Sequence, residues 1–539
     1  MSAVPDPIEA GLAAGWHVID CATLLDDRTI EADVAIIGSG AGGGVTAEIL
    51  TAAGLKVVIV EEGGLYSSRH FRMREAEAYP KLYQESAARK TRDKGINILQ
   101  GRTVGGSTTV NWTSSFRTPA ATLAHWQERY GLKDYNREAL APWFERMEAR
   151  LHIADWPTPP NANNELLRQG AQRLGIHTAA IRRNVNGCWN LGYCGMGCPT
   201  NAKQSMLVTT IPAALTGGAT LLTRARAERL VFKGDRAEHV LVAALDADGI
   251  AVTGRTVTLR ARHVVVAGGA INSPGLLLRS GAPDPAKLLG KRTFLHPTLV
   301  SAGRFAHPVE GYAGAPQTIY SDHFLDTLPV GGPAGYKLEV PPLHPLLLST
   351  TLAGFGAAHA EAMRHFANTQ GMLALLRDGF HAGSQGGAVQ LRPDGSAELD
   401  YAMTDYLWDG ARRALLTMAE IQFAAGAQAV MPMHEMARHY GSWREAKEAI
   451  GALPMQPLLT RVASAHVMGG CTMAAASRDG VVAPDGRYRE LANVSVHDGS
   501  LFPTSIGANP QLSIYAITAR LADGLARQLT KDRTQAKAA

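Results

Sequence analysis

Cysteine is scarce in this chain, with five residues among 539. So few thiols in so long a chain do not build the disulfide scaffold that small secreted domains use. Long apolar runs are missing as well, since no stretch reaches the roughly 18 uninterrupted apolar residues of a membrane helix. The N-terminal segment has no cationic start followed by an apolar core, so we expect no secretory signal. These absences predict a cytoplasmic protein, soluble or associated with the inner membrane only at its surface.

Charge of one sign is not in excess either. The chain has 53 Lys and Arg against 48 Asp and Glu, a net charge of +5. No basic stripe with interleaved aromatic residues is present, so we expect no nucleic-acid partner. Hydrophobic residues make up 46% and charged residues 19%, which is typical of a globular enzyme. The length exceeds one compact core and predicts about two to four structural units.

The apolar pattern predicts a nucleotide-binding unit near the N-terminus. Residues 33–37 form a short apolar run that is followed by glycines, a helical stretch and a second buried strand at 56–60. The β-rich segment 220–267 is typical of an antiparallel meander. The region between 300 and 460 mixes proline-rich loops with helices such as 410–426, and 494–528 returns to a strand followed by a helix. The nucleotide domain is therefore predicted to be discontinuous in sequence.

A glycine fingerprint follows the first strand. Gly38, Gly40 and Gly43 form the pattern GxGxxG, and Glu61 ends the second strand. Gly38 permits a tight turn, Gly40 lets the backbone approach a pyrophosphate, and Gly43 lets the helix pack closely on the strand. The helix N-terminus attracts the phosphates, and Glu61 is placed to accept hydrogen bonds from a ribose. This pattern fits NAD as well as FAD.

Four further stretches decide between the two cofactors. They are the glycine-rich loop 101–111, the segment 267–274, the segment 465–473 and the C-terminal segment 498–510. In this order they resemble motifs of the glucose–methanol–choline (GMC) oxidoreductases. The resemblance implies FAD as the cofactor. Some relatives attach the flavin through a histidine in the first loop, but Val110 stands at that position, so noncovalent FAD is predicted.

The same resemblance implies the fold and the cofactor contacts. The predicted class is α/β, with a discontinuous Rossmann-like FAD-binding domain (30–115, 200–300 and 462–535) and a mixed α+β substrate-binding domain (116–199 and 301–461). The predicted cofactor contacts are Gly38, Gly40, Gly43, Glu61, Arg102, Gly105, Gly106, Ser107, Asn111, Ala227, Ala267, Asp498, Gly499 and Pro510.

His466 and Asn509 stand where this family carries its catalytic pair. Oxidation of an alcohol requires removal of the hydroxyl proton, for which a neutral imidazole is suited. We therefore expect His466 to act as general base or alkoxide stabiliser, and Asn509 to bind the substrate hydroxyl. Asn509 before Pro510 is also typical of a helix N-cap, and that helix would point its positive end at the flavin. His296 resembles the family too, and its distance from the site stays open.

Three cysteines, Cys188, Cys194 and Cys198, fall within eleven residues. Their spacing resembles that of iron–sulfur ligands in bacterial FAD-dependent sugar dehydrogenases. Similar stretches occur as structural loops in relatives that resemble long-chain alcohol oxidase and cholesterol oxidase. The sequence leaves both alternatives open, and a structural zinc is disfavoured because a fourth ligand is missing.

The favoured function is an FAD-dependent alcohol dehydrogenase that passes electrons to a quinone, a cytochrome or another carrier. The alternatives are an oxidase that uses O2, a lyase of the hydroxynitrile type with non-redox FAD, and a flavin-binding subunit without its own chemistry. The favoured substrate is a primary alcohol with a hydrophobic aliphatic or aromatic body, with a sterol or a sugar as alternatives. Aromatic residues of the second domain are expected to line its pocket, among them Phe355, Tyr401, Tyr406 and Trp408.

Overall fold

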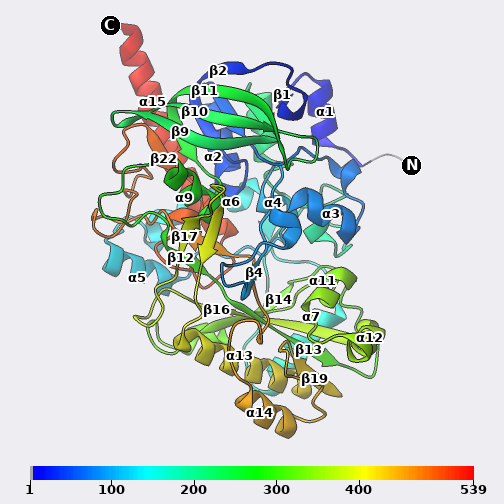
Figure 1. Ribbon diagram of the computed structural model, residues 1–539. Helices are drawn as coiled ribbons and strands as arrows, with labels where there is room; N and C mark the ends of the chain where they lie inside the picture. The colour runs from blue at the N-terminus through cyan, green and yellow to red at the C-terminus, as the bar shows by residue number, and fades with distance from the viewer. Residues whose placement is uncertain (1–3, 539) are drawn as a thin grey trace.

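The structure, a computed structural model, describes residues 4–538. Two large β-sheets dominate it, one in the upper half and one in the lower half of Figure 1. The first sheet has the order β1 (His17–Asp20), β8 (Thr220–Thr223), β3 (Val57–Val60), β2 (Arg28–Ile37), β11 (Val252–Val266), β10 (Arg236–Leu245) and β9 (Ala225–Lys233), and β22 (Val494–Val496) also pairs with β11.

The first sheet is parallel around β2 and β3 and antiparallel in the β9–β10–β11 meander. All four residues of β3 are buried, as expected of a short β-branched run in the middle of a parallel sheet. Helix α2 (Ala41–Ala52) joins β2 to β3, which confirms the predicted strand–helix–strand unit. One detail differs from the antiparallel meander predicted for 220–267. Arg224 adopts a positive φ of 49° between β8 and β9, and β8 pairs in parallel with β3.

The second sheet lies under the first in Figure 1. Its strands are β4 (Ile96–Ile98), β20 (Val462–Ser464), β13 (Thr298–Arg304), β16 (Thr369–Leu376), β15 (Tyr336–Glu339), β14 (Ile319–Ser321) and β6 (Ala179–Ala180), with β19 (Ala429–Pro432) paired to β13. Helix α13 (Asp405–Ala424) packs on β13 and β16, and its outer neighbours are α7 (Ala162–Arg173) and α14 (Trp443–Ala452). The helix predicted at 410–426 is thus present and begins five residues earlier.

Smaller elements connect the two sheets. A four-stranded sheet has the order β18 (Ala397–Asp400), β17 (Gly387–Leu391), β12 (Lys291–Leu295) and β21 (Val467–Gly469), and β5 (Ile153–Ala154) pairs with β7 (Arg183–Asn184). The other α-helices of the described residues are α1 (Pro7–Ala13), α3 (Glu75–Leu82), α4 (Ser107–Val110), α5 (Ala120–Tyr130), α6 (Arg137–Arg150), α8 (Thr210–Thr216), α9 (Gly269–Arg279), α10 (His323–Asp326), α11 (Pro345–Thr351), α12 (Gly356–Arg364) and α15 (Gln511–Ala538).

The predicted α/β class is confirmed. Strands from both ends and from the middle of the chain share the first sheet. Each large sheet has its own hydrophobic core. The domain boundaries remain a prediction.

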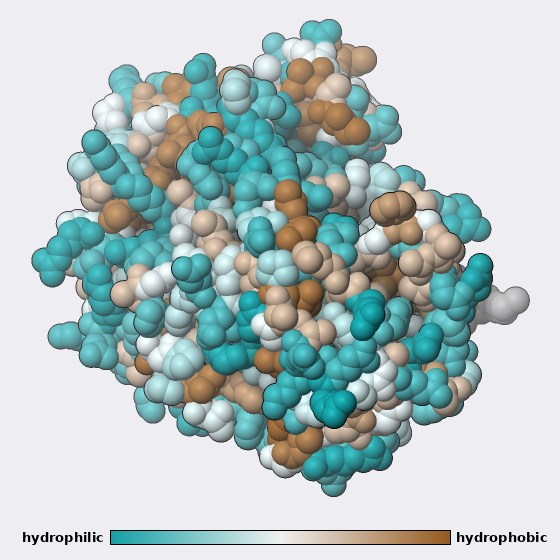
Figure 2. All heavy atoms as spheres, turned by 60° about the horizontal axis from the view of Figure 1, so that its bottom comes forward, coloured by the Kyte–Doolittle hydropathy of each residue, from teal (hydrophilic) through white to brown (hydrophobic). Residues whose placement is uncertain are grey.

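Within residues 4–538 no helix has the length and apolar character needed to cross a membrane. On the face shown in Figure 2, hydrophobic side chains lie in small groups among hydrophilic ones. Contact with a membrane surface remains a prediction.

Candidate active site

One large cavity, of about 990 Å³, has walls from both large sheets. The first sheet contributes the turns that follow β2 and β3, at the carboxyl ends of parallel strands, where α/β folds bind their ligands. The second sheet contributes apolar side chains of β13 and β16. Its volume is near the upper end of the range for small-molecule sites, about 300–1,000 Å³. It suits a large cofactor with a second ligand beside it.

The glycines after β2 fit a pyrophosphate. Gly38 has a φ of 104°, and a Cβ there would lie 2.3 Å from the Ala267 carbonyl oxygen. A Cβ on Gly43 would lie 1.9 Å from the Gly38 carbonyl oxygen, so both residues serve chain packing. A Cβ on Gly40 would meet only the Gly106 Cα, at 3.8 Å, and otherwise point into free space. Because Gly40 lines the cavity at the start of α2, that space is left for a ligand at the helix N-terminus.

Glu61 lines the cavity and links the two glycine-rich loops. Its Oε2 accepts hydrogen bonds from the backbone N (3.1 Å) and Oγ (2.6 Å) of Ser39, and its Oε1 accepts one from Gly63 N (2.8 Å). Ser39 Oγ in turn accepts a hydrogen bond from Gly105 N at 3.0 Å. Burial raises the pKa of Glu61, while these hydrogen bonds oppose the rise. Through its hydrogen bond to Ser39, Gly105 fixes the position of the second glycine-rich loop. Gly105 itself does not line the cavity.

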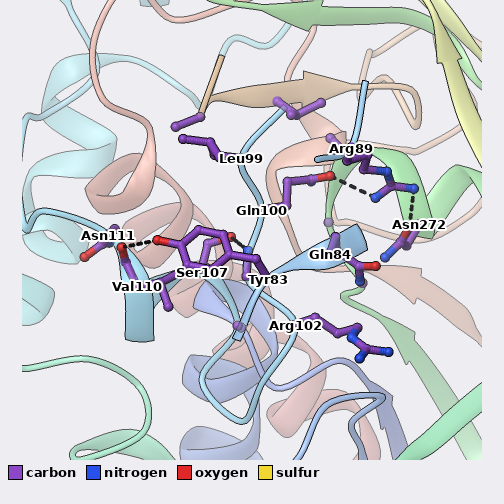
Figure 3. Close-up of a pocket in the computed structure, with 18 of the residues that line it drawn as sticks. Tyr83, Gln84, Arg89, Leu99, Gln100, Arg102, Ser107, Val110, Asn111 and Asn272 are labelled. Carbon is purple, nitrogen blue, oxygen red and sulfur yellow. Dashed lines mark hydrogen bonds between the residues drawn. The ribbon is translucent and has the colours of Figure 1, made fainter. Parts of the chain in front are cut away.

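The second loop and α4 form the next part of the wall (Figure 3). Ser107 Oγ accepts a hydrogen bond from Gly101 N at 2.9 Å, which closes the loop. Asn111 Nδ2 donates to Gln511 Oε1 at 2.7 Å and thereby ties the loop to the start of α15. The Tyr83 hydroxyl lies 3.3 Å from the carbonyl oxygen of Val110 in this segment and donates to the carbonyl oxygen of Gly195 at 2.6 Å.

Lys203, which the sequence motifs did not indicate, binds the C-terminal end of α4. Its buried Nζ donates to the carbonyl oxygens of Thr109 (2.7 Å), Asn111 (2.8 Å) and Cys194 (2.7 Å). Burial lowers the pKa of Lys203 to about 8, so the ammonium form still predominates at neutral pH. One cation thus satisfies the C-terminal carbonyls of α4 and fixes the cysteine loop against it.

Replacing Lys203 with Met is expected to lower the free energy of unfolding by about 3 kcal/mol, because three buried carbonyl groups lose their donor. FAD should also bind less tightly, since α4 borders the cavity. Chemical denaturation and FAD titration measure the two effects. The exposed Lys531→Met on α15 is the control, and equal stabilities of the two variants would contradict this role.

The three cysteines of the loop, Cys188, Cys194 and Cys198, all have free thiols. Burial raises the pKa of Cys188, while the hydrogen bond from Asn190 N to its sulfur opposes the rise. Arg183 approaches the Cys194 sulfur at 3.8 Å. Among residues 4–538 no three Cys, His, Asp or Glu side chains converge on a point where they could hold a metal. The choice between a cluster-bearing loop and a structural loop remains a prediction.

His466 and His296 form a hydrogen-bonded pair. Their Nδ1 atoms lie 3.0 Å apart, and Gly507 N donates to His296 Nε2 at 3.1 Å. A backbone N–H only donates, so His296 Nε2 carries no proton and the proton of neutral His296 sits on Nδ1. His466 Nδ1 must then accept. The proton of neutral His466 therefore sits on Nε2, the ring nitrogen left to meet a ligand in the cavity.

Both rings are kept neutral. Burial, and then the nearby Lys337 ammonium, lower the pKa of His466 to about 4. Burial, the His466 ring and Lys337 lower the pKa of His296 well below its ordinary value. At neutral pH His466 therefore offers an uncharged N–H donor to the cavity.

Asn509 lines the cavity together with His466. Its Nδ2 donates to Glu339 Oε2 at 3.2 Å, and its buried Oδ1 has no hydrogen-bond partner within the protein. The prediction that Asn509 caps the helix is wrong, because no helix N–H reaches this oxygen. The helix itself is present as α15, and Pro510, Gln511 and Ile514 bring its N-terminal end into the cavity wall.

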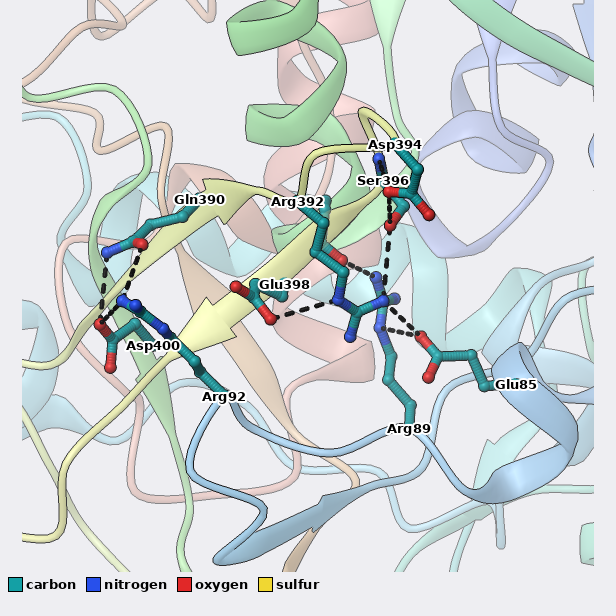
Figure 4. A network of polar contacts seen from close by, with 10 residues as sticks. Glu85, Arg89, Arg92, Gln390, Arg392, Asp394, Ser396, Glu398 and Asp400 are labelled. Atoms are coloured by element: carbon teal, nitrogen blue, oxygen red, sulfur yellow. Dashed lines mark hydrogen bonds and ion pairs between the residues drawn. The ribbon is translucent and has the colours of Figure 1, made fainter.

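The other end of the cavity is bordered by a polar network (Figure 4). Arg89 is buried and donates to Gln100 Oε1 (2.9 Å), Asn272 Oδ1 (3.1 Å) and the Ala397 carbonyl oxygen (3.0 Å). Glu85 lies within ion-pair distance of Arg89, at 3.6 Å. These residues come from separate segments of the chain, and the motif pattern gave no indication of them.

Most predicted site residues meet at this one cavity. Those that line it are Gly38, Gly40, Glu61, Arg102, Gly106, Ser107, Asn111, Ala227, Ala267, His466, Asp498, Gly499, Asn509 and Pro510. Gly43 and Gly105 lie behind the wall.

The aromatic residues expected in the pocket wall do not line it, so that prediction is wrong. Phe355 is 91% exposed, whereas Tyr401 and Trp408 belong to the core of the second sheet and Tyr406 packs against it. Aliphatic side chains take their place, and the apolar wall consists of Val300, Leu343, Leu347, Leu348, Leu373 and Leu375 with Pro341 and Pro342.

Comparison with known proteins gives a family for this arrangement. The sequence patterns of the N-terminal and C-terminal domains of the GMC oxidoreductases match residues 59–298 and 384–518 of this chain, respectively. The chain belongs to the GMC oxidoreductase family. It is therefore an oxidoreductase of a flavoprotein family whose cofactor is FAD, as the motifs predict.

Two relatives illustrate the similarity within the GMC family. A long-chain-alcohol oxidase of Arabidopsis thaliana is 28% identical over 94% of this chain and 68% of its own length. A GMC-type oxidoreductase of Sinorhizobium fredii, described as uncharacterized, is 28% identical over 96% of this chain and 99% of its own.

Solved structures agree on the GMC fold. Formate oxidase from Aspergillus oryzae superposes with a TM-score of 0.70 at 15% identity, covering 94% of this chain and all of its own. Pyridoxine 4-oxidase from Mesorbium loti superposes with a TM-score of 0.67 at 18% identity, covering 92% and 98%. At such identities the likeness shows the fold alone.

Proposed function

We propose that this GMC oxidoreductase holds FAD noncovalently and oxidises a primary alcohol with a hydrophobic body to the aldehyde. FAD supplies the acceptor for the hydride that leaves the alcohol carbon. The observation that carries the proposal is the juxtaposition of His466, with its Nε2–H, and Asn509, with its unpartnered Oδ1, at one cavity. A donor and an acceptor so placed match the oxygen and the hydrogen of a hydroxyl group.

The two side chains have complementary roles in this proposal. His466 donates its Nε2–H to the hydroxyl oxygen, and Asn509 Oδ1 accepts the hydroxyl hydrogen. The hydroxyl proton passes to water, since an amide oxygen accepts a hydrogen bond but not a proton and His466 Nε2 already carries one. The negative charge that grows on the oxygen strengthens the hydrogen bond from His466. The positions of the protons on the two histidine rings support alkoxide stabilisation over general-base action, because His466 Nε2 already carries a proton.

The apolar wall supports a substrate with a hydrophobic body. Leucine, valine and proline side chains line the part of the cavity that the second sheet and α11 provide. Relatives named long-chain-alcohol oxidases favour an aliphatic substrate. A sugar would leave its hydroxyl groups unpaired against such a wall, which is costly.

Activity is expected to rise with the alkyl chain of the alcohol. Each methylene that enters the apolar wall contributes about 0.8 kcal/mol, so kcat/KM should increase by up to about fourfold per carbon until the wall ends. A series of primary alcohols, measured with an artificial electron acceptor, gives this slope. Val300→Phe should shorten the preferred chain, whereas Val252→Phe on the exposed β11 surface should not. A flat series would contradict an aliphatic substrate.

The natural electron acceptor is the second part of the proposal. The sequence favours a quinone, a cytochrome or another carrier, whereas relatives named long-chain-alcohol oxidases favour O2. Admission of air to the alcohol-reduced protein distinguishes them, since fast return of the flavin colour means an oxidase and slow return a dehydrogenase. Reduction by alcohol in either case rejects a lyase with non-redox FAD and a subunit without chemistry of its own.

A further inference from the structure

Glu339 is a buried carboxyl group that does not line the cavity and contacts two residues that do. It ends β15, and none of its surface is exposed. Its Oε2 accepts hydrogen bonds from Asn509 Nδ2 (3.2 Å) and from Gln317 Nε2 (2.9 Å). Its Oε1 is buried without a partner. A lone carboxyl group in such a place is expensive to bury, which calls for an explanation.

The hydrogen bonds around Glu339 have one direction. Ser114 Oγ donates to Gln317 Oε1 at 3.1 Å, and Gln317 in turn donates its Nε2–H to Glu339. A carboxylate only accepts, so both amides must present their nitrogen to it. The amide of Asn509 is then fixed with its nitrogen toward Glu339, and its oxygen, on the other side of the amide, is buried without a partner within the protein.

We infer that Glu339 is a positioning residue for Asn509, whose amide it orients so that Oδ1 is the hydrogen-bond acceptor for the substrate hydroxyl. This inference rests on the proposed function, because it concerns the same hydroxyl group. Without the carboxylate the amide has no preferred orientation. If it turned over, its N–H groups would face the hydroxyl beside the N–H of His466, and no hydrogen-bond acceptor would remain for the hydroxyl group.

The charges around Glu339 affect the pH at which its carboxyl group ionises and can orient Asn509. Lys337 lies on the same face of β15, and its Nζ sits 2.7 Å from Asp322 Oδ1 and over the rings of Phe116 and Tyr320. On the adjacent strands Tyr320 of β14 and the apolar Leu373 of β16 are paired with Glu339. The titratable ring on the cavity side, His466, stays neutral in this range.

Burial raises the pKa of Glu339 to about 7, because it outweighs the effects of Lys337 and of the Asn509 hydrogen bond, which lower it. The carboxylate therefore predominates above about pH 7. Below that pH the group is protonated, can donate its own O–H and no longer selects the nitrogen of Asn509. Activity should fall as the pH falls through 7.

The test follows alcohol reduction of the FAD-loaded protein against pH. Wild-type kcat/KM should fall between about pH 8 and about pH 6 toward the level of Glu339→Gln. Glu339→Gln should be about tenfold slower at the upper pH and lack this pH dependence, because a neutral amide can present either end to Asn509. Glu339→Asp should restore part of it. Glu148→Gln, which removes a carboxylate on α6 outside the cavity, is the matched control and should keep the wild-type profile.

A second variant separates positioning from a structural role. Because Glu339 acts through Asn509, adding Glu339→Gln to Asn509→Ala should cause little further loss, whereas independent effects would multiply. Flavin absorbance and thermal unfolding show whether each variant is folded and loaded. Infrared difference titration gives a readout without activity, in which a protonated carboxyl band should appear as the pH falls through 7 and be absent in Glu339→Gln.

Two failures are distinguishable. If the wild type is reduced by alcohol and Glu339→Gln keeps the same pH profile, or its effect multiplies with that of Asn509→Ala, the assignment of Glu339 is overturned alone. If no alcohol reduces the wild-type flavin, the proposed function is overturned and this assignment with it.

Discussion

Replacement of His466 by alanine is expected to slow anaerobic reduction of the flavin by alcohol by about 10²–10³-fold, the usual cost of removing one hydrogen-bond donor to a developing oxyanion. The loss follows from the proton order of the histidine pair, in which His466 Nε2–H is the donor that meets the charge growing on the substrate oxygen. FAD should remain bound, because His466 makes no hydrogen bond to the glycine-rich loops. Stopped-flow absorbance of the FAD-loaded variant measures the rate.

His381→Ala is the matched control for this experiment. His381 stacks on Tyr406 and does not line the cavity, so its loss should leave the reduction rate within about twofold of the wild type. The account would be wrong about the catalytic pair if His466→Ala were reduced as fast as this control.

Replacement of Gly40 by alanine is expected to yield a folded protein that binds FAD poorly. The added Cβ meets the protein only at ordinary contact distance, so the fold accepts it. It occupies the space that the fingerprint leaves at the start of α2, where the pyrophosphate must approach the backbone. Overpacking of this kind costs about 1–3 kcal/mol, which corresponds to a loss of up to about 100-fold in affinity. FAD titration of the apoprotein gives the affinity.

Two other glycines serve as controls for Gly40→Ala. Gly451→Ala in α14 meets nothing within 4 Å and should leave FAD binding unchanged without lowering the stability of the fold. Gly43→Ala places a Cβ 1.9 Å from the Gly38 carbonyl oxygen and should destabilise the fold itself. If Gly40→Ala bound FAD as tightly as Gly451→Ala does, the fingerprint would not be the cofactor site.

The nucleotide-binding part could be predicted because its signals are local. A strand, a glycine turn, a helix and Glu61 follow one another within thirty residues, and each has a single structural reason. Gly42 shows where even this pattern is incomplete. A Cβ there would lie 1.6 Å from the His497 carbonyl oxygen, and that distant neighbour is not visible in the motif.

Beyond His466 and Asn509, the substrate side could not be predicted because its contacts are between distant segments. Asn509 and Glu339 are 170 residues apart, and nothing local to Glu339 marks it as a partner. The aromatic residues failed as pocket walls for a related reason. The residue types of Tyr401 and Trp408 indicate that both will be buried but not against which surface. Both pack in the core under α13.

The most direct test of the account is an anaerobic titration of the FAD-loaded protein with a long-chain primary alcohol. We expect the visible flavin absorbance to bleach and one aldehyde to form for each flavin reduced. A folded protein whose bound flavin stays oxidised with every alcohol, while a chemical reductant still bleaches it, would contradict the account.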